Sequence, residues 1–167
     1  MRTATLDTNV FPAEDLIARA SAAGIEVACV SVSKREVAGS SLEEEVAALA
    51  SLLETGVWGE SAWDECNWAS EDDDLENALT ILSNGSFPAP ASRGTLSSGQ
   101  RRQLRDAMIL CTHARAGRDV LVSNDARAFV NEGRRERIEA SFMTRVMTRA
   151  EFEAHLARSS STPNTLF

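Results

Sequence analysis

The segment from Ile25 to Val32 is apolar almost throughout and rich in Val and Ile, with Glu26 as its one charged residue. Such a run is typical of a strand that is buried on both faces of a sheet. A shorter strand is predicted to end at Leu6, and Pro12 to Gly24 have helical spacing, with Pro12 suited to the first helical turn. Two strands joined by a helical crossover pair in parallel, so the chain begins as an α/β fold.

Further helices are predicted from capping-box patterns, in which a serine at the N-cap and a glutamate three residues later satisfy free backbone N–H groups. The pattern occurs at Ser33 with Glu36 and again at Ser41 with Glu44. The second pattern opens the stretch from Leu42 to Leu53, where Leu and Val repeat on one helical face. We therefore expect this whole stretch to be helical.

The last part of the chain repeats the helix-and-strand order. A helix is predicted from about Gln100 to Ala116, followed by an apolar strand at Val120 to Val122 and a turn at Ser123 to Asp125. Thr148 with Glu151 forms another capping-box pattern, which predicts a final helix.

The predicted architecture is a three-layer α/β/α domain with a central, mainly parallel sheet. Residues 1–158 have the size of a single domain. A helical and loop-rich segment at about 57–98 lengthens this domain, with a loop at 84–98 that contains two prolines. Residues 159–167, which are rich in Ser and Thr, are expected to form a disordered tail.

Composition predicts a cytoplasmic protein without membrane contact. No stretch approaches the roughly 20 apolar residues of a membrane span, and Asp7 interrupts the N-terminus before an apolar signal region can form. The three cysteines, Cys29, Cys66 and Cys111, are odd in number and far apart. We expect buried free thiols rather than a disulfide framework or a zinc site.

The net charge of −8 is unfavourable for a protein that binds nucleic acid, because phosphate contacts normally need Lys and Arg. The arginines are nevertheless concentrated in one part of the chain. Two interpretations remain open: a local basic surface, or solvated helix faces that balance acidic neighbours. The arginines in question are Arg101, Arg102, Arg105, Arg115, Arg118, Arg127, Arg134, Arg135 and Arg137.

Four acidic residues are predicted to lie at one edge of the sheet. Asp7 follows the first strand, Glu36 lies just beyond the second, and Asp125 follows the third apolar strand. Asp106 interrupts an apolar stretch in the first half of its helix and faces the same edge. Each acid alone has an ordinary interpretation as a turn former, a helix cap or a solvated residue. Ligands bind at the carboxyl ends of parallel strands, however, so their common placement favours a site.

Carboxylates gathered in one place repel one another, and the burial of an unpaired charge costs several kcal/mol. A hard divalent cation would neutralise them, and Mg²⁺ or Mn²⁺ accepts oxygen ligands without nitrogen or sulfur. The chain has only two histidines and no clustered cysteines. The sequence therefore predicts a Mg²⁺ or Mn²⁺ site formed by Asp7, Glu36, Asp106 and Asp125.

The motifs around these acids resemble those of the PIN-domain family. The likeness spans nearly the whole chain, although the residues around Glu36 lack the apolar neighbours that are usual there. In the motif that ends at Asp125, a small hydroxyl residue, Ser123, precedes the aspartate by two positions. The motifs are Leu6–Val10, Val32–Val37, Arg105–Leu110, Leu121–Asp125 and the closing passage Val146–Phe152.

The resemblance implies metal-dependent hydrolysis of phosphodiester bonds, most often in RNA. It implies Asp7, Asp106 and Asp125 as the main metal ligands, with Glu36 completing the site. Asn9 and Ser123 would support the ligands through hydrogen bonds, and a purely turn-forming role for these two residues remains open. Small members of the family are commonly toxins of bacterial toxin–antitoxin pairs, so the resemblance also implies a homodimer and an antitoxin partner.

The sequence leaves three alternatives to a nuclease. The acidic surface favours a catalytically silent PIN-like module that acts through protein contacts. A phosphatase like the haloacid dehalogenases would use Asp7 as nucleophile, but it needs a second aspartate where Asn9 stands. A response-regulator receiver needs a lysine after a late strand, and the only lysine of this chain is Lys34.

Overall fold

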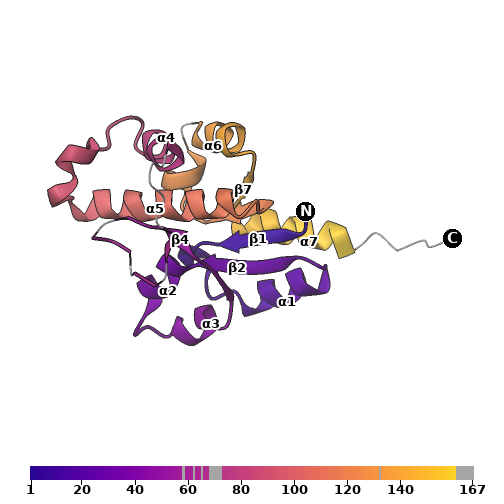
Figure 1. Ribbon diagram of the computed structural model, residues 1–167. Helices are drawn as coiled ribbons and strands as arrows, with labels where there is room; N and C mark the ends of the chain where they lie inside the picture. Colours follow the sequence, from indigo (N-terminus) through magenta and orange to yellow (C-terminus); the bar gives the residue numbers. More distant parts are fainter. Residues whose placement is uncertain (58, 62, 65, 68–72, 132, 161–167) are drawn as a thin grey trace.

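The computed structural model describes residues 1–160 apart from 58, 62, 65, 68–72 and 132. At its centre lies a parallel sheet of five strands in the order β3-β2-β1-β6-β7 (Figure 1). A separate parallel pair is formed by β4 and β5. The strands are β1 Thr3–Leu6, β2 Glu26–Val30, β3 Ala50–Leu52, β4 Glu54–Thr55, β5 Cys66–Asn67, β6 Val120–Val122 and β7 Arg145–Met147.

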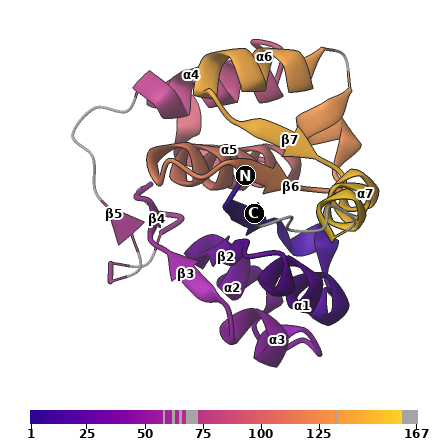
Figure 2. The same ribbon diagram turned by 90° about the vertical axis from the view of Figure 1, so that its right-hand side faces the viewer.

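Helices cover both faces of the central sheet, which confirms the predicted three-layer α/β/α arrangement (Figures 1 and 2). Apolar residues of α1, α3 and α7 pack with β1 on one face, and those of α4, α5 and α6 form the core on the other. The helices are α1 Glu14–Ala22, α2 Ser31–Val37, α3 Glu43–Ala47, α4 Asp73–Leu82, α5 Ser98–Arg115, α6 Arg134–Phe142 and α7 Arg149–Ser160.

The prediction of one helix from Leu42 to Leu53 is wrong. α3 ends at Ala47, and Ala50–Leu52 form the edge strand β3, which pairs in parallel with β2. The Nζ of Lys34 donates to the carbonyl groups of Ala47 (3.3 Å) and Leu49 (3.0 Å), which occupies backbone acceptors at the end of the helix. Pairing with a buried strand therefore overrides the helical spacing of the leucines, which is a weak local preference.

The first two capping-box predictions are also wrong. α2 begins at Ser31, so Ser33 lies inside the helix, and its Oγ has no hydrogen-bond partner among the described residues. The residue at the N-cap of α3 is Leu42, and no side chain caps that helix. Glu36, the predicted partner of Ser33, instead accepts a hydrogen bond from the hydroxyl of Thr8.

Two other helix starts follow the capping-box rule. Thr148 and Glu151 form reciprocal hydrogen bonds at the start of α7. The Thr148 N–H donates to Glu151 Oε2 (2.8 Å), and the Glu151 N–H donates to Thr148 Oγ1 (3.2 Å). Ser97 and Gln100 do the same for α5 at 2.8 and 3.3 Å, which places its start close to the predicted one.

Several element bounds differ from the prediction. α1 starts at Glu14, so Pro12 precedes the helix, and the loop predicted at 84–98 contains the 3₁₀ helix η2, Pro90–Thr95. α6 was not predicted, because Ile138 is its only buried residue and the pattern lacks an apolar face. Of the tail predicted at 159–167, the first two residues belong to α7 and the remainder lies outside the described residues.

The three cysteines differ in burial. All three cysteines are free, and Cys29 and Cys111 are buried, whereas Cys66 is only half-buried. Within the part of the chain that the structure describes, no helix has both the length and the apolar character needed to cross a bilayer.

Candidate functional site

The site begins where the order of the strands changes direction. From β1 the chain adds β2 and β3 on one side of the sheet and β6 and β7 on the other, so β1 and β6 flank the switch point. Ligands of open α/β sheets bind in the crevice beyond the carboxyl ends of such strands. Asp7 stands at the end of β1, and its N–H donates to the carbonyl of Val122 in β6 at 3.0 Å. This hydrogen bond holds the two strand ends together.

The predicted acids meet in one cavity of about 360 Å³ at this edge. They reach it from four elements: the end of β1, helix α2, helix α5 and the turn after β6. Thr8, Asn9, Arg102 and Arg105 also line the cavity. The acids are Asp7, Glu36, Asp106 and Asp125.

Asp7 is the most enclosed of the four, with 2% of its surface exposed. Its Oδ1 accepts from the N–H of Thr8 (2.7 Å), and its Oδ2 accepts from Asn9 Nδ2 (2.6 Å) and Ser123 Oγ (2.7 Å). Burial raises the pKa of Asp7, against the opposing effect of these hydrogen bonds. The resemblance to PIN domains implies that Asn9 and Ser123 support the metal ligands, and both side chains contact the carboxylate of Asp7.

Glu36 is tied to Asp7 through a shared neighbour. The hydroxyl of Thr8 donates to Glu36 Oε2 at 3.0 Å and lies 3.3 Å from Asp7 Oδ1. Arg105 of α5 approaches Glu36 Oε1 at 3.8 Å. Burial raises the pKa of Glu36, and the negative charge of Asp7 adds to the rise, whereas the hydrogen bond from Thr8 opposes it.

Asp125 combines a structural role with its place at the cavity. It is the N-cap of the short π-helix η3, Ala126–Val130, and its Oδ1 accepts from the N–H of Ala128 at 2.9 Å. Its N–H donates to Ser123 Oγ at 3.0 Å, so Ser123 connects Asp125 to Asp7. Arg102 lies 3.6 Å from the other carboxylate oxygen, Oδ2. The cap interpretation is therefore true of Asp125, and it leaves that second oxygen facing the cavity.

Asp106 differs from the other three acids in its lack of a hydrogen-bond partner among the described residues. Among the described residues its carboxylate accepts no hydrogen bond and forms no ion pair. Burial raises the pKa of Asp106 to about 8, with further rises from the negative charges of Asp7, Asp125 and Glu36. At neutral pH this carboxyl group either keeps its proton or requires a nearby positive charge.

The donor set suits a hard divalent cation. All four side chains offer carboxylate oxygens, and a cation placed among them would offset the repulsion that adds to the raised pKa values of Glu36 and Asp106. Among the described residues, no three acidic, His or Cys side chains are already arranged as a metal-binding group. Arg102 and Arg105, which now lie against Asp125 and Glu36, would have to move aside.

Thr8, Arg102 and Arg105 were not predicted as site residues. A signal for Thr8 exists in the sequence, since its hydroxyl immediately follows Asp7, but the contact with Glu36 depends on the folding of α2 against η1, Thr8–Val10. The two arginines were recognised only as members of an arginine-rich segment. Their contacts with Asp125 and Glu36 join elements that are far apart in the sequence.

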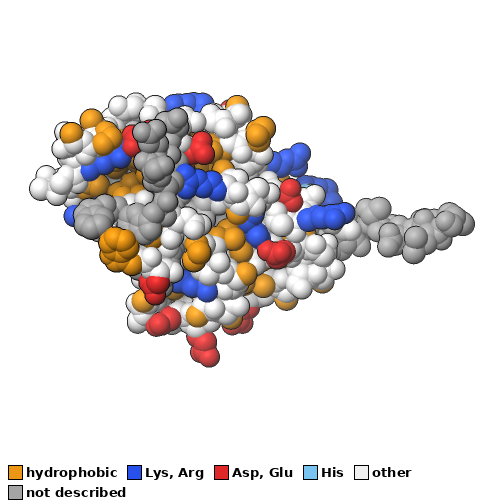
Figure 3. Space-filling model, in the orientation of Figure 1, with side chains coloured by type: hydrophobic (Ala, Val, Ile, Leu, Met, Phe, Trp, Pro, Cys, Tyr) orange, Lys and Arg blue, Asp and Glu red, His pale blue; other side chains and the backbone are white. Residues whose placement is uncertain are grey.

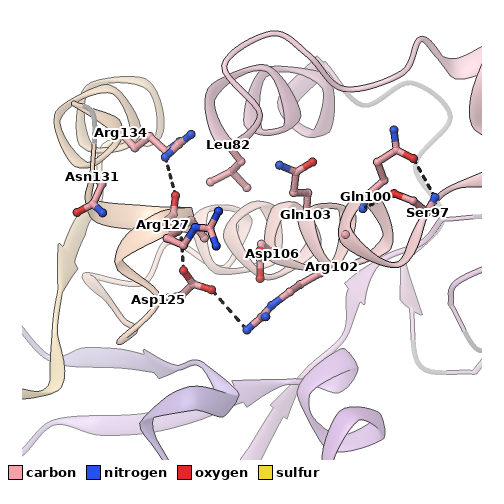
Figure 4. Close-up of a pocket in the computed structure, with 12 residues that line it drawn as sticks. Leu82, Ser97, Gln100, Arg102, Gln103, Asp106, Asp125, Arg127, Asn131 and Arg134 are labelled. Atoms are coloured by element: carbon pink, nitrogen blue, oxygen red, sulfur yellow. Dashed lines mark hydrogen bonds and ion pairs between the residues drawn. The ribbon is translucent and has the colours of Figure 1, made fainter.

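The two interpretations of the arginine-rich segment each hold for part of it. Arg118 pairs with Glu26, Arg135 pairs with Glu151, and Arg101 pairs with Glu60, as the charge-balancing interpretation requires. Arg102, Arg127 and Arg134 line a groove beside the carboxylates, where Arg102 lies 3.6 Å from Asp125 (Figure 4). On the face shown in Figure 3, acidic side chains gather at the lower edge, over α3, whereas basic and acidic side chains are mixed above.

No protein-family model, curated protein or solved structure matches the chain. Its α/β architecture and the position of the acidic cavity at the switch point are therefore the grounds on which function can be inferred.

Proposed function

We propose that this protein is a nuclease of the PIN type that hydrolyses phosphodiester bonds with bound Mg²⁺ or Mn²⁺. The observation that carries the proposal is the meeting of Asp7, Glu36, Asp106 and Asp125 in one cavity at the switch point of a parallel sheet. Strongly perturbed acids in a cleft are typical of functional sites. The half-buried carboxyl group of Asp106 has no hydrogen-bond or ion-pair partner among the described residues, and a bound cation would supply one.

Under this proposal each residue of the site has a distinct task. Asp7, Asp106 and Asp125 hold the cation, and Glu36 completes its shell. Ser123, Asn9 and Thr8 fix the orientation of the ligands through the hydrogen bonds described above. Once bound, the cation would activate a water molecule and stabilise the charge that grows on the phosphate. Arg102, whose side chain is 72% exposed, can turn from Asp125 toward a substrate phosphate.

RNA is the proposed substrate on the strength of the PIN-like motifs. Those motifs also underlie a more specific proposal: a cytoplasmic endoribonuclease that acts as the toxin of a toxin–antitoxin pair, forms a homodimer and is inhibited by an antitoxin that covers the site. The carboxylates support the metal chemistry directly, whereas the choice of RNA rests on the resemblance alone.

The two alternatives to this proposal are a phosphatase and a silent protein-interaction module. A phosphatase would need Asp7 as an accessible nucleophile, but that carboxylate is buried and both of its oxygens accept hydrogen bonds. A silent protein-interaction module is favoured by the net charge of −8 and by the acidic side chains over α3. Cleavage assays separate the module from the nuclease.

The test is cleavage of a random-sequence RNA pool and a matching DNA pool by purified protein with Mn²⁺, with Mg²⁺ and with EDTA. We expect cleavage that EDTA abolishes and that restored Mn²⁺ recovers. Asp7→Asn and Asp106→Asn should lower the rate about 100-fold or more. Asp74→Asn, an equal change at an exposed position of α4, should leave it unchanged. Cleavage that persists in EDTA, or the absence of any cleavage, would contradict the proposal.

A further inference from the structure

A second cavity, of about 600 Å³, continues from the carboxylate site along α5 (Figure 4). The two cavities share Arg102, Asp106 and Asp125, so they form one continuous surface. The groove lies between the first turns of α5, the end of α4 and the stretch from η3 to the start of α6. A molecule that reaches Asp106 from this side must lie along the groove.

The charge of this groove differs from that of the protein as a whole. The chain carries a net charge of −8, yet Arg102, Arg127 and Arg134 all line the groove. Of the described residues that line it, only the two site carboxylates are acidic. Arg134 Nη1 donates to the backbone carbonyl of Arg127 at 2.6 Å. This hydrogen bond holds the guanidinium of Arg134 beside the backbone of Arg127. The groove therefore offers positive charge next to the place where a phosphate would react.

The other side chains of the groove are polar but uncharged, or apolar. Gln100, Gln103 and Asn131 offer amide groups along its length, and Leu82 lies at the α4 side (Figure 4). No aromatic side chain is found among the described residues that line it. Arginine and amide groups contact phosphates and sugars, whereas the stacking of bases needs aromatic rings or free guanidinium planes.

We propose that this groove binds the sugar–phosphate backbone of a single-stranded polynucleotide, on one side of the bond that is cut. The inference rests on the proposed nuclease function, because the groove ends at the carboxylates. Arg127 and Arg134 contact phosphates beyond the scissile one, and Arg102 stands at the junction of the two cavities. A flexible single strand can bring its phosphate down to the half-buried Asp106 without first unpairing. Contacts to the backbone alone predict weak preference for base sequence.

The experiment measures binding apart from cleavage. Fluorescence anisotropy follows a labelled single-stranded RNA oligonucleotide of mixed sequence in EDTA, with the full chain carrying Asp106→Asn. In this background Arg127→Gln with Arg134→Gln should weaken binding about tenfold or more. The slope of log K against log salt should fall by about 1.4, since each single-strand phosphate contact contributes about 0.7.

A matched control removes the same charge elsewhere. Arg145→Gln with Arg158→Gln changes two exposed arginines of β7 and α7 and should leave binding within about twofold. Arg127→Gln alone changes an exposed side chain, so it reports on the groove even if loss of the bond from Arg134 disturbs η3. We expect Arg127→Lys to retain most of the affinity.

Failure of this inference and failure of the nuclease proposal are distinguishable. Absence of binding, or equal losses in the groove and control variants, overturns the proposal that the groove binds a polynucleotide, even if the wild-type protein cleaves RNA. Selective loss in the groove variants supports the groove even if no cleavage is found. Tighter binding of a duplex of the same sequence overturns the single-strand assignment.

Discussion

The two ends of the central sheet treat buried charge in opposite ways. At the amino end, the buried guanidinium of Arg118 donates to Glu26 Oε1 (2.8 Å) and to the carbonyl of Ala4 (2.9 Å). Asp119 accepts from the backbone N–H groups of Arg2 (2.6 Å) and Thr3 (3.0 Å), and these bonds lower its pKa. Arg118 and Asp119 therefore each have partners of opposite polarity.

At the carboxyl end, three further carboxylates gather around the buried Asp7, and two of them repel neighbouring acids although Arg102 and Arg105 lie close by. Burial raises the pKa values of Asp7, Glu36 and Asp106, and their mutual repulsion adds to the rise for the last two. A fold that satisfies its charges at one end of a sheet is able to satisfy them at the other. The difference supports the proposal that the carboxyl end binds a ligand, and we expect the amino end to contribute to stability.

Asp106→Asn should break this comparison most strongly, because it is expected to change activity and stability in opposite directions. Cleavage should fall about 100-fold or more. The metal-free protein at pH 8 should become more stable by about 3 kcal/mol, since burial penalises the ionised carboxylate more than the neutral amide. Urea unfolding in EDTA measures the gain, and a variant less stable than the wild type would count against the repulsion.

Arg118→Met tests the opposite end. Removal of the guanidinium leaves Glu26 and the carbonyl of Ala4 without their donor, so we expect a loss of about 2–3 kcal/mol in the free energy of unfolding. Cleavage by the folded variant should remain within about twofold, because the residue is remote from the carboxylates. Denaturant unfolding and the RNA assay give both values. A much smaller loss would show that the hydrogen bonds of Arg118 to Glu26 and Ala4 contribute little to stability.

The pH dependence of stability should separate the two ends again. Burial and the nearby charge of Arg118 lower the pKa of His113 to about 4, and its ring bonds to Thr5 (2.9 Å) and Thr144 (2.5 Å). The folded state binds the proton less readily than the unfolded state. This stabilising contribution is therefore complete above about pH 6.5 and is lost as pH falls through about 4, by about 2 kcal/mol.

Asp106 has the opposite sign. Its pKa is raised, so its contribution is complete below about pH 4 and is lost as pH rises through about 8. Unfolding curves from pH 4 to pH 8 in EDTA should show that Asp106→Asn reduces the decline toward high pH, whereas His113→Gln reduces the decline toward low pH. An unchanged profile in either variant would contradict the assignment for that residue.

Ser123→Ala should have the smallest of these effects. Its hydroxyl donates to Asp7 and accepts from the N–H of Asp125, so its loss should loosen two ligands without removing one. We expect metal affinity and kcat/KM to fall about tenfold, as is common for groups that orient metal ligands. Ser159→Ala, at an exposed position of α7, is the matched control. A loss as large as that in Asp106→Asn would assign Ser123 a more direct role.

The sequence predicts those parts of the fold in which one local pattern decides the outcome. The strands β2 and β6 are apolar or nearly so, β1 alternates threonine with apolar residues, and α5 and α7 begin with capping boxes. β3 was predicted as helix, because its three residues are mostly exposed and only pairing with β2 defines them as a strand. α6 was missed for a related reason, since one buried residue does not make a periodic pattern.

The site was predictable to the extent that it follows from strand order. Asp7 and Asp125 follow adjacent strands, and Asp106 marks itself as a charge within an apolar helix. The edge of the sheet predicted for Glu36 is correct. The predicted capping box of Ser33 with Glu36 is wrong, because α2 begins at Ser31. The contacts of Arg102, Arg105 and Thr8 depend on distances between separate elements, which no local pattern contains.

Titration of the metal-free protein with Mn²⁺ in a calorimeter at pH 7.5 tests the central claim most directly. We predict saturable binding accompanied by release of protons, because a cation among the carboxylates lowers the raised pKa of Asp106. Asp106→Asn should weaken that binding about tenfold or more and Asp74→Asn should leave it unchanged. Absence of Mn²⁺ binding in the wild-type protein, or equal binding in Asp106→Asn, would contradict the claim that the carboxyl edge of the sheet is a metal site.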